Sequence, residues 1–104
     1  MARAVRWAEA ATRDLAEAAE FIARDSRFYA AALVREARTA ARSLRTLSER
    51  GRLVPEARAA DVRELFVKSY RLIYRVSPKV VTVIAFVHGA RDLAALWGRR
   101  GEAP

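Results

Sequence analysis

Four side chains in the C-terminal half of the chain could act together on a phosphate. Lys68 and Arg71 lie in one alternating segment, and His88 and Arg91 lie in the segment HGARD. Lysine and arginine can neutralise charge that develops on a phosphate, and histidine can exchange a proton near neutral pH. Cleavage of RNA without a metal ion needs both functions, together with an acid for the leaving oxygen. A surface that cuts nucleic acid is therefore one function that these residue types allow; a binding face for an acidic partner and a sheet edge kept soluble by charge are the others.

The composition excludes several other kinds of site. The 104 residues include no cysteine and a single histidine, so a thiolate metal site is impossible and a zinc site is not expected. The glycines are scattered and form no phosphate-binding loop, and no pair of carboxylates is placed for hydrolysis. We therefore expect no metal and no cofactor.

The chain is strongly basic, with a formal net charge of +8. This charge favours an acidic partner, which is either nucleic acid or an acidic protein. Part of this positive charge can instead reflect a general enrichment of the chain in alanine and arginine, without any relation to a partner. No apolar run reaches the length of a membrane span, and the N-terminus lacks the apolar region of a signal peptide. We therefore expect a cytoplasmic protein without a membrane anchor.

The N-terminal half of the chain predicts a strand followed by two helices. Residues 2–7 alternate loosely and suit a short strand, whereas the apolar spacing from Ala8 onward is typical of an amphipathic helix. Asp25 or Ser26 can cap a second helix, whose apolar stripe continues to Leu47. Because the connection is short, the two helices should form an antiparallel hairpin.

The C-terminal half predicts a hairpin sheet and a closing helical turn. Residues 48–55 read as a turn in which Gly51 adopts a positive φ, and residues 56–61 read as a loop. An apolar period of two then predicts strands at residues 63–68, 70–76 and 80–87. A short helical turn should follow and end at Gly98. The expected fold is one α+β domain over residues 1–104, with the helical hairpin packed on a twisted antiparallel sheet.

The second predicted strand has arginines on one side and apolar residues on the other. If its tyrosines and Leu72 face the helices, Arg71 and Arg75 emerge on the opposite, open face of the sheet. There they could bind an acidic ligand or protect an exposed sheet from aggregation. Glu64 could pair with either arginine across the hairpin.

Four segments in this order resemble the RelE/ParE superfamily of type II toxin–antitoxin toxins. The longest is VRELFVKSYRLIYRV (62–76); the others are VHGARDL (87–93), DS (25–26) and ERGR (49–52). The resemblance covers nearly the whole chain and implies the same helical hairpin on a twisted sheet.

The resemblance implies one of two functions. RelE-like members cleave mRNA in the ribosomal A site, and Arg71, Arg91 and, approximately, Lys68 match their cations. Where that branch has a C-terminal tyrosine, this chain has Trp97, whose indole cannot act as an acid or base. His88 could replace the tyrosine, or it could simply cap the end of its strand. We therefore favour a ParE-like inhibitor of DNA gyrase, with a RelE-like ribosome-dependent mRNA endoribonuclease as the alternative.

The resemblance also implies a cognate antitoxin with an acidic segment, which would form a hetero-oligomer with the chain. The expected antitoxin contacts are Phe21, Phe28, Leu53, Val54 and Phe66. The expected gyrase contacts are Arg91, Trp97, Arg99 and Arg100, unless Trp97 closes the core instead. A chain that ends at Gly98 should still fold and bind the antitoxin.

Overall fold

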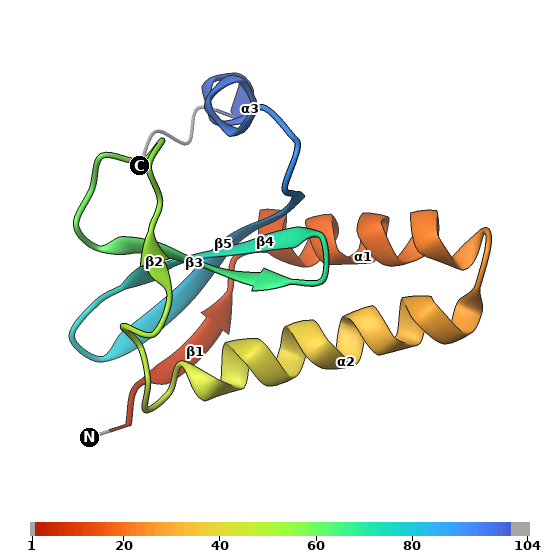
Figure 1. Cartoon of the computed structure of the whole chain (residues 1–104). Helices are drawn as coiled ribbons and strands as arrows, with labels where there is room; N and C mark the ends of the chain where they lie inside the picture. The colour runs from red at the N-terminus through yellow and green to blue at the C-terminus, as the bar shows by residue number, and fades with distance from the viewer. Residues whose placement is uncertain (1, 101–104) are drawn as a thin grey trace.

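The computed structural model describes residues 2–100 as three helices and a five-stranded sheet (Figure 1). This architecture confirms the predicted α+β class. In chain order the elements are β1 (Ala4–Trp7), α1 (Glu9–Ala23), α2 (Arg27–Ser43), β2 (Arg52–Leu53), β3 (Val62–Val67), β4 (Tyr70–Val76), β5 (Val80–His88) and α3 (Leu93–Arg100). None of these helices is long and apolar enough to cross a membrane.

The strands lie in the order β1-β5-β4-β3-β2. The three predicted strands β3, β4 and β5 pair antiparallel, whereas β1 runs parallel to β5 at one edge. The other edge is β2, which was not predicted because its two residues lie in a segment read as a turn. It pairs with β3 only at Glu64 and Arg63. On the side of β3 that faces β2, the residues after Glu64 therefore have no neighbouring strand within the described part of the chain.

The hairpin of α1 and α2 covers one face of the sheet, as expected (Figure 1). Ser26 caps α2, since its hydroxyl accepts a hydrogen bond of 3.1 Å from the backbone N–H of Tyr29. The second helix ends earlier than its apolar stripe suggested: Leu44 is buried at the C-cap, and Leu47 is exposed. The core beneath the hairpin includes Leu15, Leu33, Leu72, Tyr74, Val83 and Phe86.

The opposite face of the sheet is covered rather than open. Helix α3 lies on this side (Figure 1), and its Leu93, Leu96 and Trp97 form a second core with Ile73 and Ala85 of the sheet, joined by Val54 and Ala57 of the loop after β2. The expected helical turn is thus a helix of eight residues, which passes through Gly98 instead of ending there. A glycine inside a helix costs only about 1 kcal/mol relative to alanine, and here Arg100, beyond Gly98, is held by its ion pair with Asp14.

Gly51 is required for a close approach of two backbone segments, and not for a turn with positive φ. A Cβ on Gly51 would lie 2.5 Å from the carbonyl oxygen of Glu64 and 2.6 Å from the hydroxyl of Tyr74, and its φ lies outside the left-handed region. The N–H of Gly51 donates a hydrogen bond of 2.9 Å to that hydroxyl. Burial raises the pKa of Tyr74 above its usual value, which keeps the hydroxyl protonated at neutral pH.

Candidate functional site

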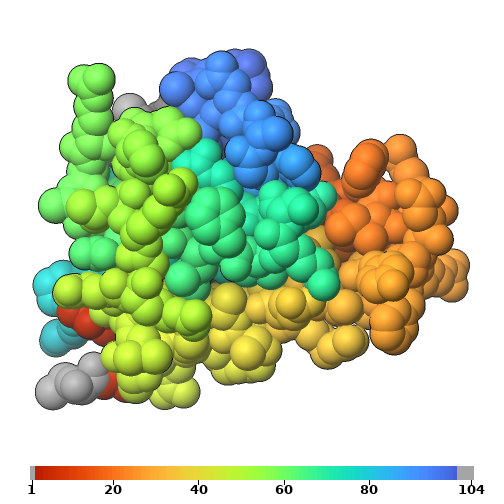
Figure 2. Space-filling model, viewed as in Figure 1, coloured from red at the N-terminus to blue at the C-terminus, as the bar shows by residue number. Residues whose placement is uncertain are grey.

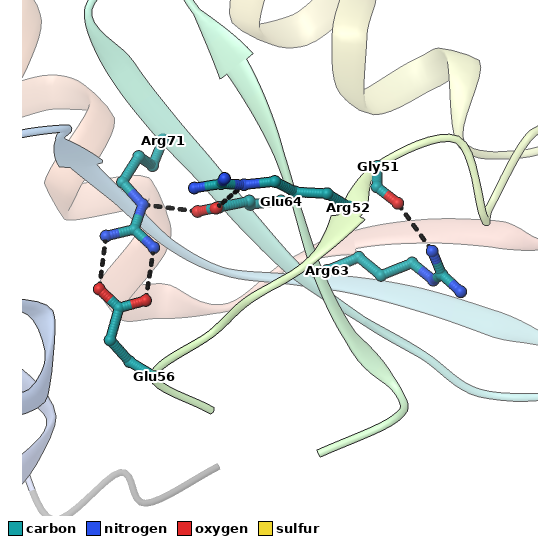
Figure 3. Close-up of polar contacts among 6 residues, drawn as sticks. All are labelled: Gly51, Arg52, Glu56, Arg63, Glu64 and Arg71. Atoms are coloured by element: carbon teal, nitrogen blue, oxygen red, sulfur yellow. Dashed lines mark hydrogen bonds and ion pairs between the residues drawn. The ribbon is translucent and has the colours of Figure 1, made fainter. Parts of the chain in front are cut away.

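Four charged side chains from three strands and one loop form a cluster on the face that α3 covers (Figure 3). We call it the Arg71 cluster: Arg71 on β4, Glu64 on β3, Arg52 on β2, and Glu56 in the loop between β2 and β3. The two Nη atoms of Arg71 donate to the two carboxylate oxygens of Glu56, at 3.0 and 2.8 Å. Its Nε donates to Glu64 at 2.5 Å. The second oxygen of Glu64 accepts from Nε of Arg52 at 2.6 Å.

This arrangement satisfies charges that would be costly to bury alone. The whole Arg71 residue is 5% exposed and Glu64 is 1% exposed, and an unpaired ion at such positions would destabilise the fold by several kcal/mol. The hydrogen bond from Arg71 is the main cause that lowers the pKa of Glu56 below its usual value of 4.5. The same bond is the main cause that raises the pKa of Arg71. Glu56 and Arg71 are therefore both ionised at neutral pH.

The cluster corrects the expectation that Arg71 lies on an open surface. Arg71 does point away from the helical hairpin, but the loop that carries Glu56 and the helix α3 cover this face. The predicted pairing of Glu64 across the strand hairpin is confirmed, with Arg71 as its partner. Arg75 lies nearer the rim, partly exposed, and its Nε is 3.3 Å from a carboxylate oxygen of Asp61.

The other three catalytic candidates do not join Arg71. Lys68 lies in the turn between β3 and β4 with a φ of 53°, and its Nζ is 2.9 Å from a carboxylate oxygen of Glu36 on α2. His88 is exposed at the end of β5, where its Nδ1 accepts a hydrogen bond of 3.2 Å from the N–H of Ala90. This bond matches the structural reading of His88 as a cap of the strand end. His88 packs edge-on against Tyr70, on the opposite side of β4 from Arg71.

His88 and Arg91 instead line a hollow beside α1, with a volume of about 410 Å³. Phe21 of α1 forms one wall, and Tyr70 stacks on Phe86 at 5.1 Å between ring centroids to form another. The sequence placed Phe21 among the antitoxin contacts and Arg91 among the gyrase contacts, yet both side chains border this one hollow. Asp14 and Glu17 also line it. Aromatic rings and arginine, both present here, are enriched in protein-binding surfaces.

Two of the four expected gyrase contacts, Trp97 and Arg100, make contacts within the fold. Trp97 is 3% exposed within the second core, which matches the alternative that it closes the core. Its indole N–H has no hydrogen-bond partner among the described residues. Arg100 reaches across to α1, where Nη2 lies 2.6 Å from a carboxylate oxygen of Asp14. Arg91 and Arg99 are exposed.

Four of the five expected antitoxin contacts are exposed apolar side chains. Phe28 is the most exposed, at 72%, and Leu53 the least, at 50%. Val54 is the exception, because it is 2% exposed and packs in the second core. Strand alternation explains the difference, since neighbouring residues of an extended segment point to opposite sides. Val54 therefore cannot contact a partner directly in this fold.

The exposed apolar residues form two surfaces. Phe21 and Phe28 belong to the end of the hairpin where α1 passes into α2, and Leu53 and Phe66 belong to β2 and β3. Figure 2 shows the hairpin end (orange) at the right of the view, whereas β2 and β3 (green) lie to the left and in the middle. A groove of about 480 Å³ lies between α2 and the edge of β3, bordered by Arg35, Glu36, Thr39, Ala40, Phe66, Val67 and Lys68.

Sequence reasoning missed two carboxylates that form ion pairs in the fold, Glu56 and Asp14. Glu56 follows Pro55 in a segment without periodicity, so nothing in its neighbourhood signals a partner. Asp14 is buried on α1 and accepts a hydrogen bond of 3.0 Å from the backbone N–H of Phe86. Its position beside Leu15, next to the apolar stripe, is the one signal that could have marked it. Residues 2–100 contain no group of three or more histidines and carboxylates that could hold a metal ion.

Comparisons with known proteins agree with this geometry. A family model described as ParE toxin of type II toxin-antitoxin system, parDE, matches residues 5–93. The fold is similar to that of a solved chain from the chromosomal ParDE toxin–antitoxin system of P. aeruginosa, with a TM-score of 0.68 and 17% sequence identity. That match covers 83% of this chain and 95% of the solved one. No curated protein matches the chain by sequence.

Proposed function

The chain belongs to the ParE toxin family of type II toxin–antitoxin systems, and on that basis we propose that it inhibits DNA gyrase in the bacterial cytoplasm and is neutralised by a cognate antitoxin. The proposal takes the chain as a binding protein and not as an enzyme. It requires an exposed surface for the target, a second surface for the antitoxin and no assembled catalytic site.

The observation that carries the proposal is the internal pairing of Arg71. A ribonuclease needs this cation at the scissile phosphate, but here two carboxylates occupy its donors. His88, the candidate acid–base group, packs on the opposite side of β4 from Arg71. Trp97 offers no ionisable hydroxyl and is buried. The geometry therefore favours the gyrase inhibitor over the RelE-like alternative.

The unpaired edge of β3 is a suitable binding site for the antitoxin. Beyond Glu64 this edge has no neighbouring strand within residues 2–100, and an extended peptide can add to such an edge by backbone hydrogen bonds. Phe66 and Leu53 stand exposed beside it, and the groove along α2 begins there. An acidic segment complements the net charge of +8. We propose that this segment covers the β3 edge, with Phe21 and Phe28 contacting a further part of the antitoxin.

We propose that the gyrase-binding surface consists of Arg91 and Arg99 together with the His88 side of the hollow beside α1, opposite the Phe21 wall that is assigned to the antitoxin. Both arginines are exposed, and an exposed guanidinium can form directional hydrogen bonds with a carboxylate. Trp97 and Arg100 act indirectly, because they hold α3 in place.

Two assays with purified protein test the proposal. We expect the full-length chain to block DNA supercoiling by gyrase and to leave mRNA intact on ribosomes, and an excess of antitoxin should restore supercoiling. The double substitution Arg91→Ala and Arg99→Ala should weaken inhibition about tenfold or more. Arg42→Ala, which removes an exposed arginine from α2, is the matched control and should inhibit normally. Cleavage of mRNA with gyrase left untouched would overturn the assignment.

A further inference from the structure

The Arg71 cluster contains an internal substitute for a bound anion. We propose that Glu56 fills a phosphate-type oxyanion site built around Arg71, and that its carboxylate prevents the chain from binding phosphate there. Glu56 is thus a specificity-determining residue: with Glu56 present the domain does not bind RNA phosphates at Arg71, and without it the domain could bind them. The inference concerns this site alone and does not depend on gyrase as the target.

The contact geometry is the first argument. Both Nη atoms of Arg71 donate to Glu56, one to each oxygen, at 3.0 and 2.8 Å (Figure 3). A guanidinium makes the same two parallel hydrogen bonds with a carboxylate or with a phosphate. The position of the Glu56 carboxylate is therefore one that two phosphate oxygens could occupy.

The roles of the two carboxylates differ, which is the second argument. Glu64 lies on a strand with a side chain that is 0% exposed, and it binds both Arg71 and Arg52. It holds the guanidinium in position and belongs to the framework of the site. Glu56 lies on a loop with its side chain 33% exposed, and it contacts only the outer end of Arg71. Removal of Glu56 would therefore open the Arg71 fork to solvent while Glu64 kept the arginine in place.

The charge balance is the third argument. The cluster has two arginines and two glutamates, so its net charge is zero and an incoming phosphate gains nothing from it. Without Glu56 the cluster carries one positive charge, inside a domain whose net charge is already +8. A buried or partly buried cation such as Arg71 is screened less by salt than one on the surface, so its attraction for an anion is stronger.

The test uses the full-length protein with Glu56→Ala and two probes, inorganic phosphate and a short single-stranded RNA. In the variant, phosphate or RNA should shift the NMR signal of the Arg71 Nε–H, and RNA should bind about tenfold more tightly than to the wild type. The wild-type signal should not move with either probe. A shift with both probes identifies a general oxyanion site, and a shift with RNA alone identifies a phosphodiester site.

Three controls isolate the site from the general charge. Asp61→Ala changes the net charge equally and removes the carboxylate beside Arg75, yet it should not produce the tenfold gain. Glu56→Ala combined with Arg71→Lys keeps the positive charge but loses the fork, and the gain should disappear. Glu56→Gln, which preserves the shape of the loop, should give a smaller gain. A folded Glu56→Ala protein that binds RNA no better than Asp61→Ala, with no shift at Arg71, would overturn the inference.

Discussion

Arg100 of α3 and Asp14 of α1 form a two-point ion pair between elements at opposite ends of the chain. The Nη atoms of Arg100 lie 3.2 and 2.6 Å from the carboxylate oxygens of Asp14. Asp14 also accepts the N–H of Phe86, which lies beyond the stretch of β5 that pairs with β1. One carboxylate thus completes the hydrogen bonding of a strand edge and anchors the last helix.

We expect Arg100→Ala to lower the free energy of unfolding by about 1–3 kcal/mol, because it leaves the buried carboxylate of Asp14 without its cation. Urea denaturation followed by circular dichroism measures the change. Arg99→Ala, which removes the exposed neighbour, is the control and should change stability by less than about 0.5 kcal/mol. Equal stability of the two variants would contradict this role of Arg100. A chain ending at Gly98 should likewise be destabilised, because it also lacks Arg100.

Gly51→Ala should destabilise the fold by about 1–3 kcal/mol, since the new methyl group would meet the Glu64 carbonyl at 2.5 Å. Gly98 offers a matched control, because a Cβ there meets nothing within 4 Å and the residue lies inside α3. Gly98→Ala should therefore be neutral or stabilise the protein by up to about 1 kcal/mol. Thermal unfolding of both variants checks the prediction, and a stable Gly51→Ala protein would contradict it.

Trp97 should tolerate replacement by phenylalanine better than its burial suggests. Its indole N–H lacks a partner among the described residues, so Trp97→Phe removes an unsatisfied donor along with some apolar area. We expect a cost below about 1.5 kcal/mol for Trp97→Phe, against about 3–5 kcal/mol for Trp97→Ala. Gyrase inhibition by the folded Trp97→Phe protein should remain intact. If inhibition is lost without loss of stability, Trp97 contacts the target after all.

Acid should weaken the fold through Glu56. Its pKa in the folded protein is lowered from 4.5, chiefly by the hydrogen bond from Arg71. The stabilisation is therefore fully present above about pH 4.5 and is lost as the pH falls through the lower folded-state value. Urea midpoints of the wild type and Glu56→Gln should differ at pH 7 and converge toward pH 3. A difference that stays constant over this range would exclude a contribution from the ionised carboxylate.

Leu53 and Phe66 should matter for the antitoxin and not for stability. Both are at least half exposed, so Leu53→Ser and Phe66→Ser should fold normally. We expect each to weaken binding of the antitoxin by about tenfold or more, if its segment covers the β3 edge. Titration calorimetry with the cognate antitoxin measures the effect, and Leu47→Ser, another exposed leucine, is the control. Unchanged affinity in both variants would place the antitoxin elsewhere.

Local patterns in the sequence determined most of the secondary structure. The change of the apolar period from that of a helix to a period of two correctly located the helical hairpin and the three long strands that follow it. Ser26, one of the two caps predicted for the second helix, is the residue that caps it. Such a cap is predictable because it depends only on the next few residues. Val5 and Trp7 both pack on the hairpin core, as strand alternation required. The two-residue strand β2 had too little sequence to show a period.

Tertiary structure alone decided the environment of the candidate site residues. Glu56 and Arg71 are 15 residues apart, and Asp14 and Arg100 are 86 apart, so no local pattern connects either pair. The sequence indicated that Arg71 points away from the helices, but not that a loop and α3 cover that face. Whether a side chain is buried depends on which distant segment packs over it. Because of that packing, Arg71 is a buried cation with internal ion-pair partners and not the surface cation that was expected.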